Sequence, residues 1–278
     1  MKRLRQGILL GLLLLLGANF PLTAQDTLSS HHPDLTRSFK WVVGEELFYK
    51  VRYAFFTIGT LYFKVEEQDT LHGRPVYHCK MHIKSNTSIP FVPDLDDSYD
   101  SFIDEDFYSH KFIAYEKQKG YWLYTLYEMN YENNTIHIYV ERHYPADTLV
   151  AIDSVATIPG PVQDGISLLY FARAHAKSSS PVEIPVFAFN ELKSTVINFT
   201  GEPRKVKAKG KEVLGYYLDG KLKFVGIAGI KEGFKGWFSP DLQSIPLHAK
   251  MKAIVGHVRV NLEWWKEWDE DGYLAQKE

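Results

Sequence analysis

Apolar and polar residues alternate in short runs from Glu46 almost to the end of the chain. Because successive side chains of a β-strand point to opposite faces of the sheet, this pattern indicates strands with one dry and one wet face. The apolar members of five such runs are Leu47, Tyr49, Val51 and Tyr53; Leu61, Phe63 and Val65; Tyr77, Cys79, Met81 and Ile83; Ile136, Ile138 and Val140; and Val258, Val260, Leu262 and Trp264. We therefore predict a mainly β fold of about a dozen strands, either a large curved antiparallel sheet or an open β-barrel.

Residues 164–177 predict a helix instead of a strand. The residues at helical spacing are Ile166, Leu169, Tyr170 and Arg173. Asp164 is placed to cap the amino end, and His175 and Lys177 lie where the helix dipole favours positive charge. We expect one main α-helix in this region.

A hairpin turn is predicted at Asp219 and Gly220, which separate the strand-like runs VLGYYL and KLKFVG. Both central residues of a type I′ turn need a positive φ, and an Asp-Gly pair adopts it at low cost. We expect the chain to reverse direction there.

The first 24 residues predict a signal peptide. Three of the first five residues are basic, an apolar run follows over residues 8–16, and small residues favour cleavage after Ala24. No later run approaches the roughly 20 apolar residues of a membrane-spanning helix. The lone cysteine, Cys79, does not follow the signal, which excludes a lipid anchor and an internal disulfide. We expect an exported protein, soluble in the periplasm or secreted.

The expected organisation after the signal peptide is a flexible leader over residues 25–40, a single β domain over 41–268 and a tail over 269–278. The formal net charge is −2, and basic residues do not gather in a run. A nucleic-acid-binding protein usually carries a basic patch, so we expect no nucleic acid as a partner.

Several motifs resemble those of a known family. They are GEELFYKVRYAFFTIGTLYFKV from Gly44, YDSFID from Tyr99, DGISLLYFAR from Asp164, and GWFSPDLQSIPLHAK from Gly236 followed by GHVRVNLEWW from Gly256. On these motifs the chain resembles the bacterial domain-of-unknown-function family 3108 (DUF3108) over essentially its whole mature length. The resemblance implies a fold and no particular activity, because function depends on the site and not on the fold.

Two patterns invite a metal site and fail on geometry. His78 and His82 lie on a predicted strand, where four residues separate them by about 13 Å, too far to share one zinc ion. We expect both to be solvated surface histidines. The residues that fit the ligand positions of a calcium loop are Asp94, Asp96, Ser98, Asp100 and Glu105. Tyr99 occupies the position where that loop needs glycine, so we expect a solvated acidic loop, or a strand over YDSFID.

Candidate nucleophiles are equally weak. Cys79 lies on the apolar face of its predicted strand, which predicts a buried, inert thiol. Ser167 follows Gly165, but Leu169 replaces the second glycine of the G-x-S-x-G motif. The sequence therefore predicts no catalytic residue, no metal and no cofactor, and we expect a protein that is not an enzyme.

The candidate ligand-binding residues are apolar. Ile89, Phe91 and Val92 lie in the proline-containing loop SIPFVPD, which suits a lid over an apolar groove or a membrane-touching tip. Trp264 and Trp265 suit anchoring at a lipid surface. The alternative is that these rings fill a large core, and Trp264 falls in register with the buried face of its strand.

The leading hypothesis is a non-enzymatic protein of the periplasm or cell envelope that binds an apolar, lipid-like ligand. By analogy, an exported open sheet around a helix is similar to the lipoprotein carriers of the LolA and LolB type, which hold acyl chains in such a groove. One alternative is a structural or partner-binding envelope protein without a small ligand. A second alternative is a hydrolase with an unrecognised site.

Overall fold

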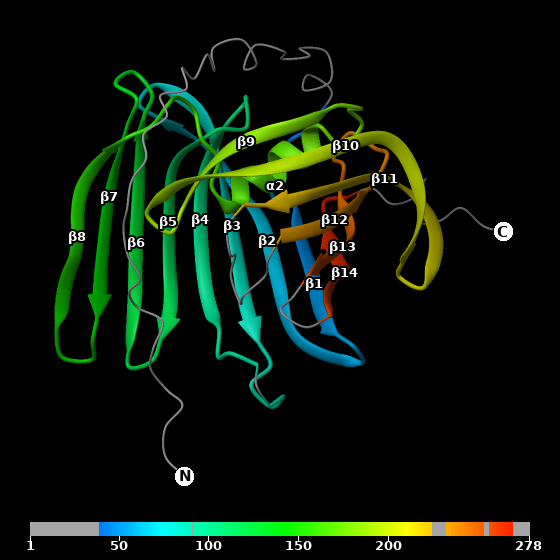
Figure 1. Ribbon diagram of the computed structural model, residues 1–278, viewed down its shortest axis with the longest axis horizontal. Helices are drawn as coiled ribbons and strands as arrows, with labels where there is room; N and C mark the ends of the chain where they lie inside the picture. The colour runs from blue at the N-terminus through cyan, green and yellow to red at the C-terminus, as the bar shows by residue number, and fades with distance from the viewer. Residues whose placement is uncertain (1–38, 91, 224–231, 253–255, 269–278) are drawn as a thin grey trace, which may run out of the picture. The chain divides into compact units, whose positions relative to one another are not determined.

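One antiparallel sheet of 14 strands contains most of the residues that the structure describes (Figure 1). The structure is a computed structural model that describes residues 39–90, 92–223, 232–252 and 256–268. The strands are β1 (Glu46–Tyr53), β2 (Phe56–Leu71), β3 (Arg74–Ser85), β4 (Asp96–Asp104), β5 (Ser109–Gln118), β6 (Tyr121–Asn130), β7 (Thr135–His143), β8 (Thr148–Thr157), β9 (Pro181–Ala188), β10 (Glu191–Ala208), β11 (Lys211–Leu222), β12 (Glu232–Phe238), β13 (Pro246–Lys252) and β14 (His257–Lys266). The helix α2 (Gly165–Ala174) follows β8 in the chain. The predicted mainly β fold with one main helix is confirmed.

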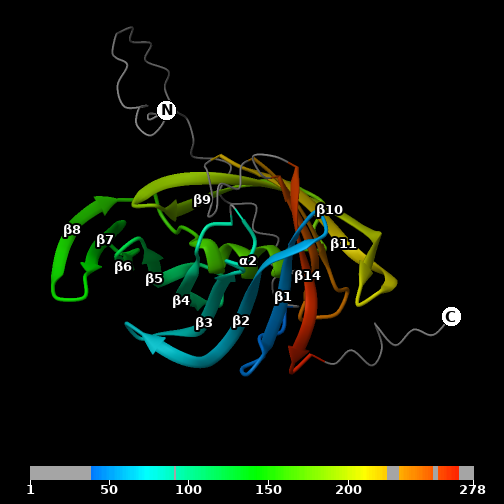
Figure 2. The ribbon, with the colours of Figure 1, turned by 90° about the horizontal axis from the view of Figure 1, so that it is seen from below.

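The strand order is β8-β7-β6-β5-β4-β3-β2-β1-β14-β13-β12-β11-β10-β9. Neighbours in the sheet are therefore neighbours in the chain, except that β1 pairs with the last strand, β14. The sheet curves so that its two halves face each other across α2 (Figure 2). Strand β8, which precedes α2 in the chain, and strand β9, which follows it, form the two edges of the sheet.

The alternating pattern places its apolar residues on the inner face, as predicted. On β7, for example, Ile136, Ile138 and Val140 are buried, and the residues between them are not. Helix α2 packs into this inner face, where Ile166 and Tyr170 join a cluster with strands β2 to β5. Ala172 joins a second cluster with β9 to β12. The helix therefore fills the space between the two halves of the sheet.

The predicted turn at Asp219 and Gly220 is wrong, because both residues lie inside β11 and pair with β10 and β12. A Cβ atom on Gly220 would lie 2.3 Å from the Phe234 ring and 2.4 Å from the Val196 carbonyl oxygen. Glycine is needed there for this close approach and not for a turn. The chain reverses earlier, between β10 and β11, where Lys209 and Gly210 have φ values of 52° and 80°.

The predicted facing of Trp264 is also wrong. The β1–β14 ladder shifts register between Phe48 and Tyr49, which pair with Trp264 and Leu262. This irregularity leaves one extra residue on β14 and reverses the alternation beyond it. Trp264 is consequently 49% exposed, and Trp265 packs against the core in its place.

The segment before β1 is packed against the inner face. Trp41 lies between the rings of Tyr77 and Tyr170, with ring centroids 4.2 and 4.7 Å away. Phe39, in the expected leader, contacts both Trp41 and Phe107 at 5.2 and 5.4 Å. Aromatic pairs at such distances stabilise a fold beyond the area that they bury. The packed part of the chain thus begins no later than Phe39.

The predicted signal peptide (residues 1–24), the leader up to residue 38, Phe91 and the predicted tail (269–278) lie outside the described residues. Within the described part of the chain, no helix has the length and apolar character that a membrane crossing requires.

Candidate functional site

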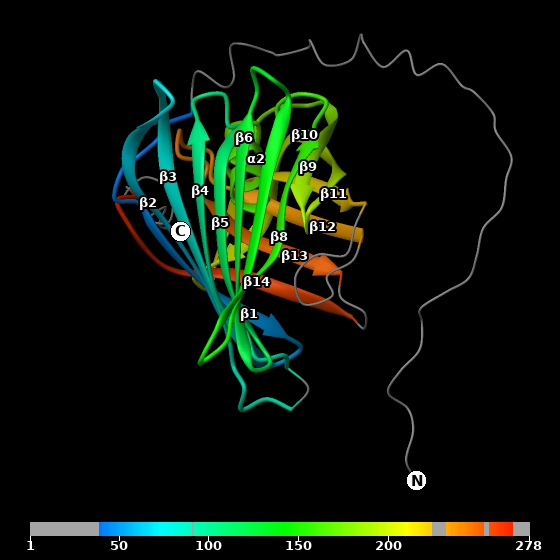
Figure 3. The same ribbon diagram turned by 90° about the vertical axis from the view of Figure 1, so that its left-hand side faces the viewer.

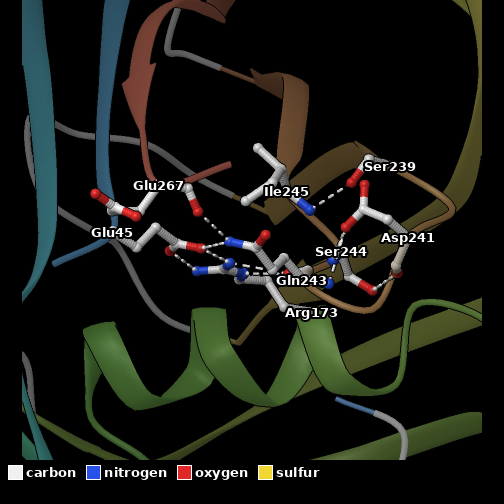
Figure 4. Close-up of polar contacts among 8 residues, drawn as sticks. All are labelled: Glu45, Arg173, Ser239, Asp241, Gln243, Ser244, Ile245 and Glu267. Atoms are coloured by element: carbon white, nitrogen blue, oxygen red, sulfur yellow. Dashed lines mark hydrogen bonds and ion pairs between the residues drawn. The ribbon is translucent and has the colours of Figure 1, made fainter. Parts of the chain in front are cut away.

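A charged pair lies at the centre of the described fold, on the side of α2 that faces β1 (Figure 4). Arg173 Nη1 and Nη2 donate to the two carboxylate oxygens of Glu45, each at 2.7 Å. The two side chains are only 1% and 2% exposed. Burial alone would lower the pKa of Arg173, but the attraction of the Glu45 carboxylate outweighs it and raises that pKa. Arg173 is therefore held in its charged form beside the Glu45 carboxyl group, and both side chains are buried.

Gln243 completes this arrangement, which we call the ionic centre (Glu45, Arg173 and Gln243). Arg173 Nε and Nη2 donate to the Gln243 carbonyl oxygen at 3.1 and 2.9 Å. The Gln243 side-chain amide donates to Glu45 Oε2 and to the Glu267 carbonyl oxygen, both at 3.0 Å (Figure 4). Asp241 holds the same loop by accepting from the backbone of Gln243 at 2.8 Å and from Trp268 Nε1 at 3.0 Å. The centre thus links α2, the start of β1 and the chain on either side of β13 and β14.

A second buried carboxylate fixes the amino end of α2. Asp164 Oδ1 accepts from the backbone N–H groups of Ile166 and Ser167 at 2.7 and 2.8 Å, and Ser101 Oγ donates to Oδ2 at 2.5 Å. Ser167 Oγ accepts from the Asp164 backbone at 2.8 Å, which completes a capping box. Burial raises the pKa of Asp164, and these donors oppose the rise. The predicted cap is confirmed, and Ser167 is a first-turn residue as expected.

The Glu45 and Arg173 side chains have no free hydrogen-bonding atom to offer a substrate. Both oxygens of Glu45 and all three nitrogens of the Arg173 side chain are already bonded within the chain. Cys79 is fully buried, and burial raises the pKa of its thiol, which disfavours the reactive thiolate. The predicted burial of Cys79 is confirmed.

The two histidines of β3 each face a separate carboxylate of β4. His78 Nε2 lies 2.6 Å from Asp100 Oδ1, and His82 Nε2 lies 2.8 Å from Asp96 Oδ1. His82 is solvated as predicted, with 40% of its side chain exposed, but His78 is only 13% exposed because it stacks on Phe102. The acidic segment is mostly strand β4, so the calcium-loop geometry does not form. Among the described residues, acidic, histidine and cysteine side chains do not gather in threes that would suit a metal ion.

The turn between β1 and β2 presents two aromatic rings outward. Phe55 is 99% exposed and Phe56 is 56% exposed. They follow Ala54, which adopts a φ of 49° in this tight turn. Beside it, in the β3–β4 loop, Ile89 and Val92 are partly exposed and Pro90 is exposed. We call these five residues the apolar tip (Phe55, Phe56, Ile89, Pro90 and Val92).

Backbone contacts hold the two parts of the apolar tip together. The Asn86 backbone N–H donates to the Ile58 carbonyl oxygen at 2.8 Å, and its side chain donates to the Thr57 carbonyl oxygen at 3.1 Å. Strands β2 and β3 approach so closely here that a Cβ atom on Gly59 would lie 2.6 Å from the Lys84 carbonyl oxygen. The β1–β2 turn and the β3–β4 loop project at the same end of the sheet, the lower edge in Figure 1. The apolar tip is thus built on anchored backbone.

The structure divides the predicted binding residues into two groups. Ile89 and Val92 belong to the apolar tip, and Phe91 lies outside the described residues. Trp264 and Trp265 pair with Phe48 and Leu47, at the far end of β1. Tyr53 is six residues after Leu47, a distance of about 20 Å along a strand, so the tryptophans and the tip form no common site.

Sequence reasoning missed Phe55 and Phe56, which dominate the apolar tip. The available signal was the pair itself, because two adjacent phenylalanines interrupt the alternation of YKVRYAFFTIG. Adjacent strand residues point to opposite faces, so a pair of this kind marks a turn or an exposed ring.

Comparison with known proteins gives one family match. The model of the family described as "Protein of unknown function (DUF3108)" matches residues 49–263. No curated protein matches the chain. Among solved structures, a β-barrel-like protein of the domain of unknown function DUF1849 from Brucella abortus is 13% identical with a TM-score of 0.49, over 83% of this chain and 100% of that chain. A protein with a YmcC-like fold from Bacteroides fragilis is 8% identical with a TM-score of 0.37, over 82% of this chain and 98% of that chain.

Proposed function

The chain belongs to the DUF3108 family of proteins of unknown function, and on that premise we propose that it is an exported, non-enzymatic cell-envelope protein that binds an apolar, lipid-like ligand at the apolar tip. The exposure of Phe55 carries the proposal, because its ring is 99% exposed on an anchored turn. Burying a Phe side chain stabilises a protein by about 1.5–3 kcal/mol. Because folding leaves the Phe55 ring exposed, the free energy of burying it is still available to stabilise a complex with a ligand.

The composition of the apolar tip favours lipid over a polar ligand. Its two rings stand beside Ile89, Pro90 and Val92, and this group offers apolar surface without a charged member. Basic side chains lie further back on the same strands. Arg52 pairs with Glu263 at 3.5 Å, and Lys84 pairs with Asp96 at 3.5 Å. Apolar side chains in front of cations match the order of acyl chains and headgroups in a lipid layer.

Export is supported by the amino-terminal sequence. Basic residues precede the apolar run over residues 8–16, and small residues lead to Ala24. This is the pattern of a cleaved secretory signal. N-terminal sequencing of the protein from the cell envelope checks the proposal, and a retained apolar run would overturn the compartment.

Vesicle binding tests the role of the tip. The mature chain is mixed with vesicles of phosphatidylethanolamine and phosphatidylglycerol and sedimented, and the double substitution Phe55→Ser, Phe56→Ser is compared with it. Two rings at about 1.5–3 kcal/mol each predict that binding weakens on the order of 100-fold or more. The matched control is Leu192→Ser, Leu214→Ser, which removes side chains that are 45% and 52% exposed on other strands. Equal binding by both double variants would overturn the proposal.

A second measurement separates lipid from a protein partner. Material extracted from the purified protein is analysed by mass spectrometry, and the extract of the Phe55→Ser, Phe56→Ser variant is the control. A lipid that is present with the unaltered chain and depleted with the variant supports the proposal. Failure of the unaltered chain both to retain lipid and to bind vesicles would move the function to docking on another envelope protein.

A further inference from the structure

We infer that strand β8 is a self-association edge, through which a second copy of this chain pairs antiparallel and extends the sheet. Within the described residues β8 pairs with β7 alone, which leaves its other side open (Figure 3). None of its ten residues is buried. An open strand edge presents a row of backbone donors and acceptors that another strand can complete.

The opposite edge of the sheet is protected, which sets β8 apart. Strand β9 begins at Pro181, and the segment before α2 lies along it. The Gln163 backbone donates to the Pro185 carbonyl oxygen at 2.9 Å and accepts from Phe187 at 2.8 Å. Proline and a covering segment are two of the means by which proteins block edge pairing. The fold thus protects one edge and leaves the other available.

The side chains of β8 lack the usual edge protection by charge. Leu149, Val150 and Val155 are 50%, 49% and 67% exposed. The strand contains no lysine or arginine, and its one charged residue is Asp153. That carboxylate already faces His137 Nε2 of β7 at 2.8 Å. The half of β8 around Val155 therefore offers a second strand an exposed apolar side chain and a single charge that already has a partner.

The same features favour a second copy of this chain over another occupant. Antiparallel pairing of a strand with itself is two-fold symmetric, so that every favourable contact forms twice. The β7–β8 ladder is regular from Ile152 to Thr157, beyond the shift at Val140. In this half Asp153, Val155 and Thr157 share one face. A register centred on Val155 places that residue against its own copy and Asp153 against Thr157, so the two carboxylates do not meet.

The oligomeric state of the mature chain tests the inference. Sedimentation velocity from about 1 to 100 μM is expected to show a monomer–dimer equilibrium in this range, typical of a modest interface. Val155→Lys is expected to abolish the dimer, because the register brings two ammonium groups face to face. Leu214→Lys, at a 52% exposed position on β11, is the control and should dimerise normally. A monomer at every concentration, or equal dimerisation of both variants, would overturn the inference.

A cross-linking experiment tests the same pairing without introducing a charge into β8. Opposed strand residues have Cβ atoms about 5 Å apart, within reach of a disulfide after small adjustment. Val155→Cys is expected to form a covalent dimer on mild oxidation at least about ten times faster than Leu214→Cys, because pairing raises the local concentration of the two thiols. Cys79 is buried and stays out of the reaction. Equal rates for the two variants would contradict the pairing.

Self-association and lipid binding are separable. The Phe55→Ser, Phe56→Ser variant should dimerise like the unaltered chain, since the apolar tip and β8 lie on different strands. Val155→Lys should still bind vesicles as a monomer. Loss of the dimer in the Phe55→Ser, Phe56→Ser variant would assign association to the apolar tip and overturn the role of β8.

Discussion

The ionic centre and the apolar tip depart from ordinary side-chain placement in opposite directions. Arg173 and Glu45 bring two charges into the interior, where they are 1% and 2% exposed. Phe55 holds an aromatic ring in the solvent at 99% exposure. The charges are compensated within the chain, because each has a partner at 2.7 Å. The ring has no such compensation.

This difference separates structural from functional peculiarities. A buried ion pair is tolerated when each charge is paired and hydrogen-bonded. The ionic centre meets this condition, so its role is to link the elements of the fold. The Phe55 ring of the apolar tip contributes little packing to the fold, since it is 99% exposed. An unusual feature that the fold does not explain points outside the molecule.

The largest expected effect on stability is at the ionic centre. Arg173→Met leaves the Glu45 carboxylate buried without its cationic partner, so the free energy of unfolding should fall by about 3–5 kcal/mol. Urea unfolding followed by tryptophan fluorescence measures it. The double substitution Glu45→Gln, Arg173→Met should cost less than Arg173→Met alone, because no buried charge remains. A cost below about 1 kcal/mol, the range of surface substitutions, would remove the contrast with the apolar tip.

A smaller loss is expected where β11 and β12 approach closely. Gly220→Ala places a Cβ atom 2.3 Å from the Phe234 ring, which must shift. Overpacking of this kind costs about 1–3 kcal/mol. Gly233→Ala is the matched control on the neighbouring strand, because no atom lies within 4 Å of its added Cβ. Thermal unfolding of the two variants should differ, and equal midpoints would show that the ring moves aside freely.

Two acidic residues on neighbouring strands, Asp97 of β4 and Glu116 of β5, should make the stability of the protein depend on pH. Burial raises the pKa of Asp97 and of Glu116, and the nearby Asp97 carboxylate raises the pKa of Glu116 further. The hydrogen bond from Tyr99 to Glu116 at 2.8 Å opposes the rise at Glu116. A raised pKa means that the folded state holds the proton more tightly. Its contribution to stability is therefore complete below the ordinary value of 4.5 and is lost as pH rises through the folded pKa. As pH falls from neutral toward 4.5, the free energy of unfolding should rise, and Glu116→Gln should make this rise smaller. An unchanged dependence on pH in the variant would contradict the assignment.

The smallest expected effect on stability is at the apolar tip. Phe55→Ser should change the free energy of unfolding by less than about 0.5 kcal/mol, because a fully exposed side chain has no packing to lose. Vesicle binding should nevertheless weaken. Urea unfolding and sedimentation of the same preparation make the comparison. Destabilisation as large as that of Gly220→Ala would mean that the ring supports the fold after all.

Local patterns in the sequence predicted the strands and the helix. Alternation such as that of Ile136, Ile138 and Val140 depends only on residues two apart, and Asp164 lies within three residues of the backbone groups that it caps. Such patterns involve only residues close in the chain, so they do not depend on how the strands are arranged in the sheet. The turn at Asp219 and Gly220 failed because the close approach of Phe234, on another strand, required the same glycine.

Features that depend on distant pairing were beyond the sequence. Glu45 and Arg173 are 128 residues apart, and nothing local distinguishes either from a surface charge. The facing of Trp264 depends on an irregularity in its pairing with β1. In the candidate site, the loop with Ile89 and Val92 was recognisable from its composition. The β1–β2 turn beside it was not, because its proximity follows from pairing between β2 and β3.

The pairing of β1 with β14 has a consequence for the order of folding. Lys50 of β1 and Glu263 of β14 are 213 residues apart in the chain. At a synthesis rate of roughly 5–20 residues per second, β1 waits on the order of ten seconds or more for its second neighbour. Its free edge is exposed to other unfolded chains until the two strands pair, and contacts of such long range also slow folding. We therefore expect a chaperone that shields the early strands until the carboxyl-terminal strand arrives to increase the yield of folded protein.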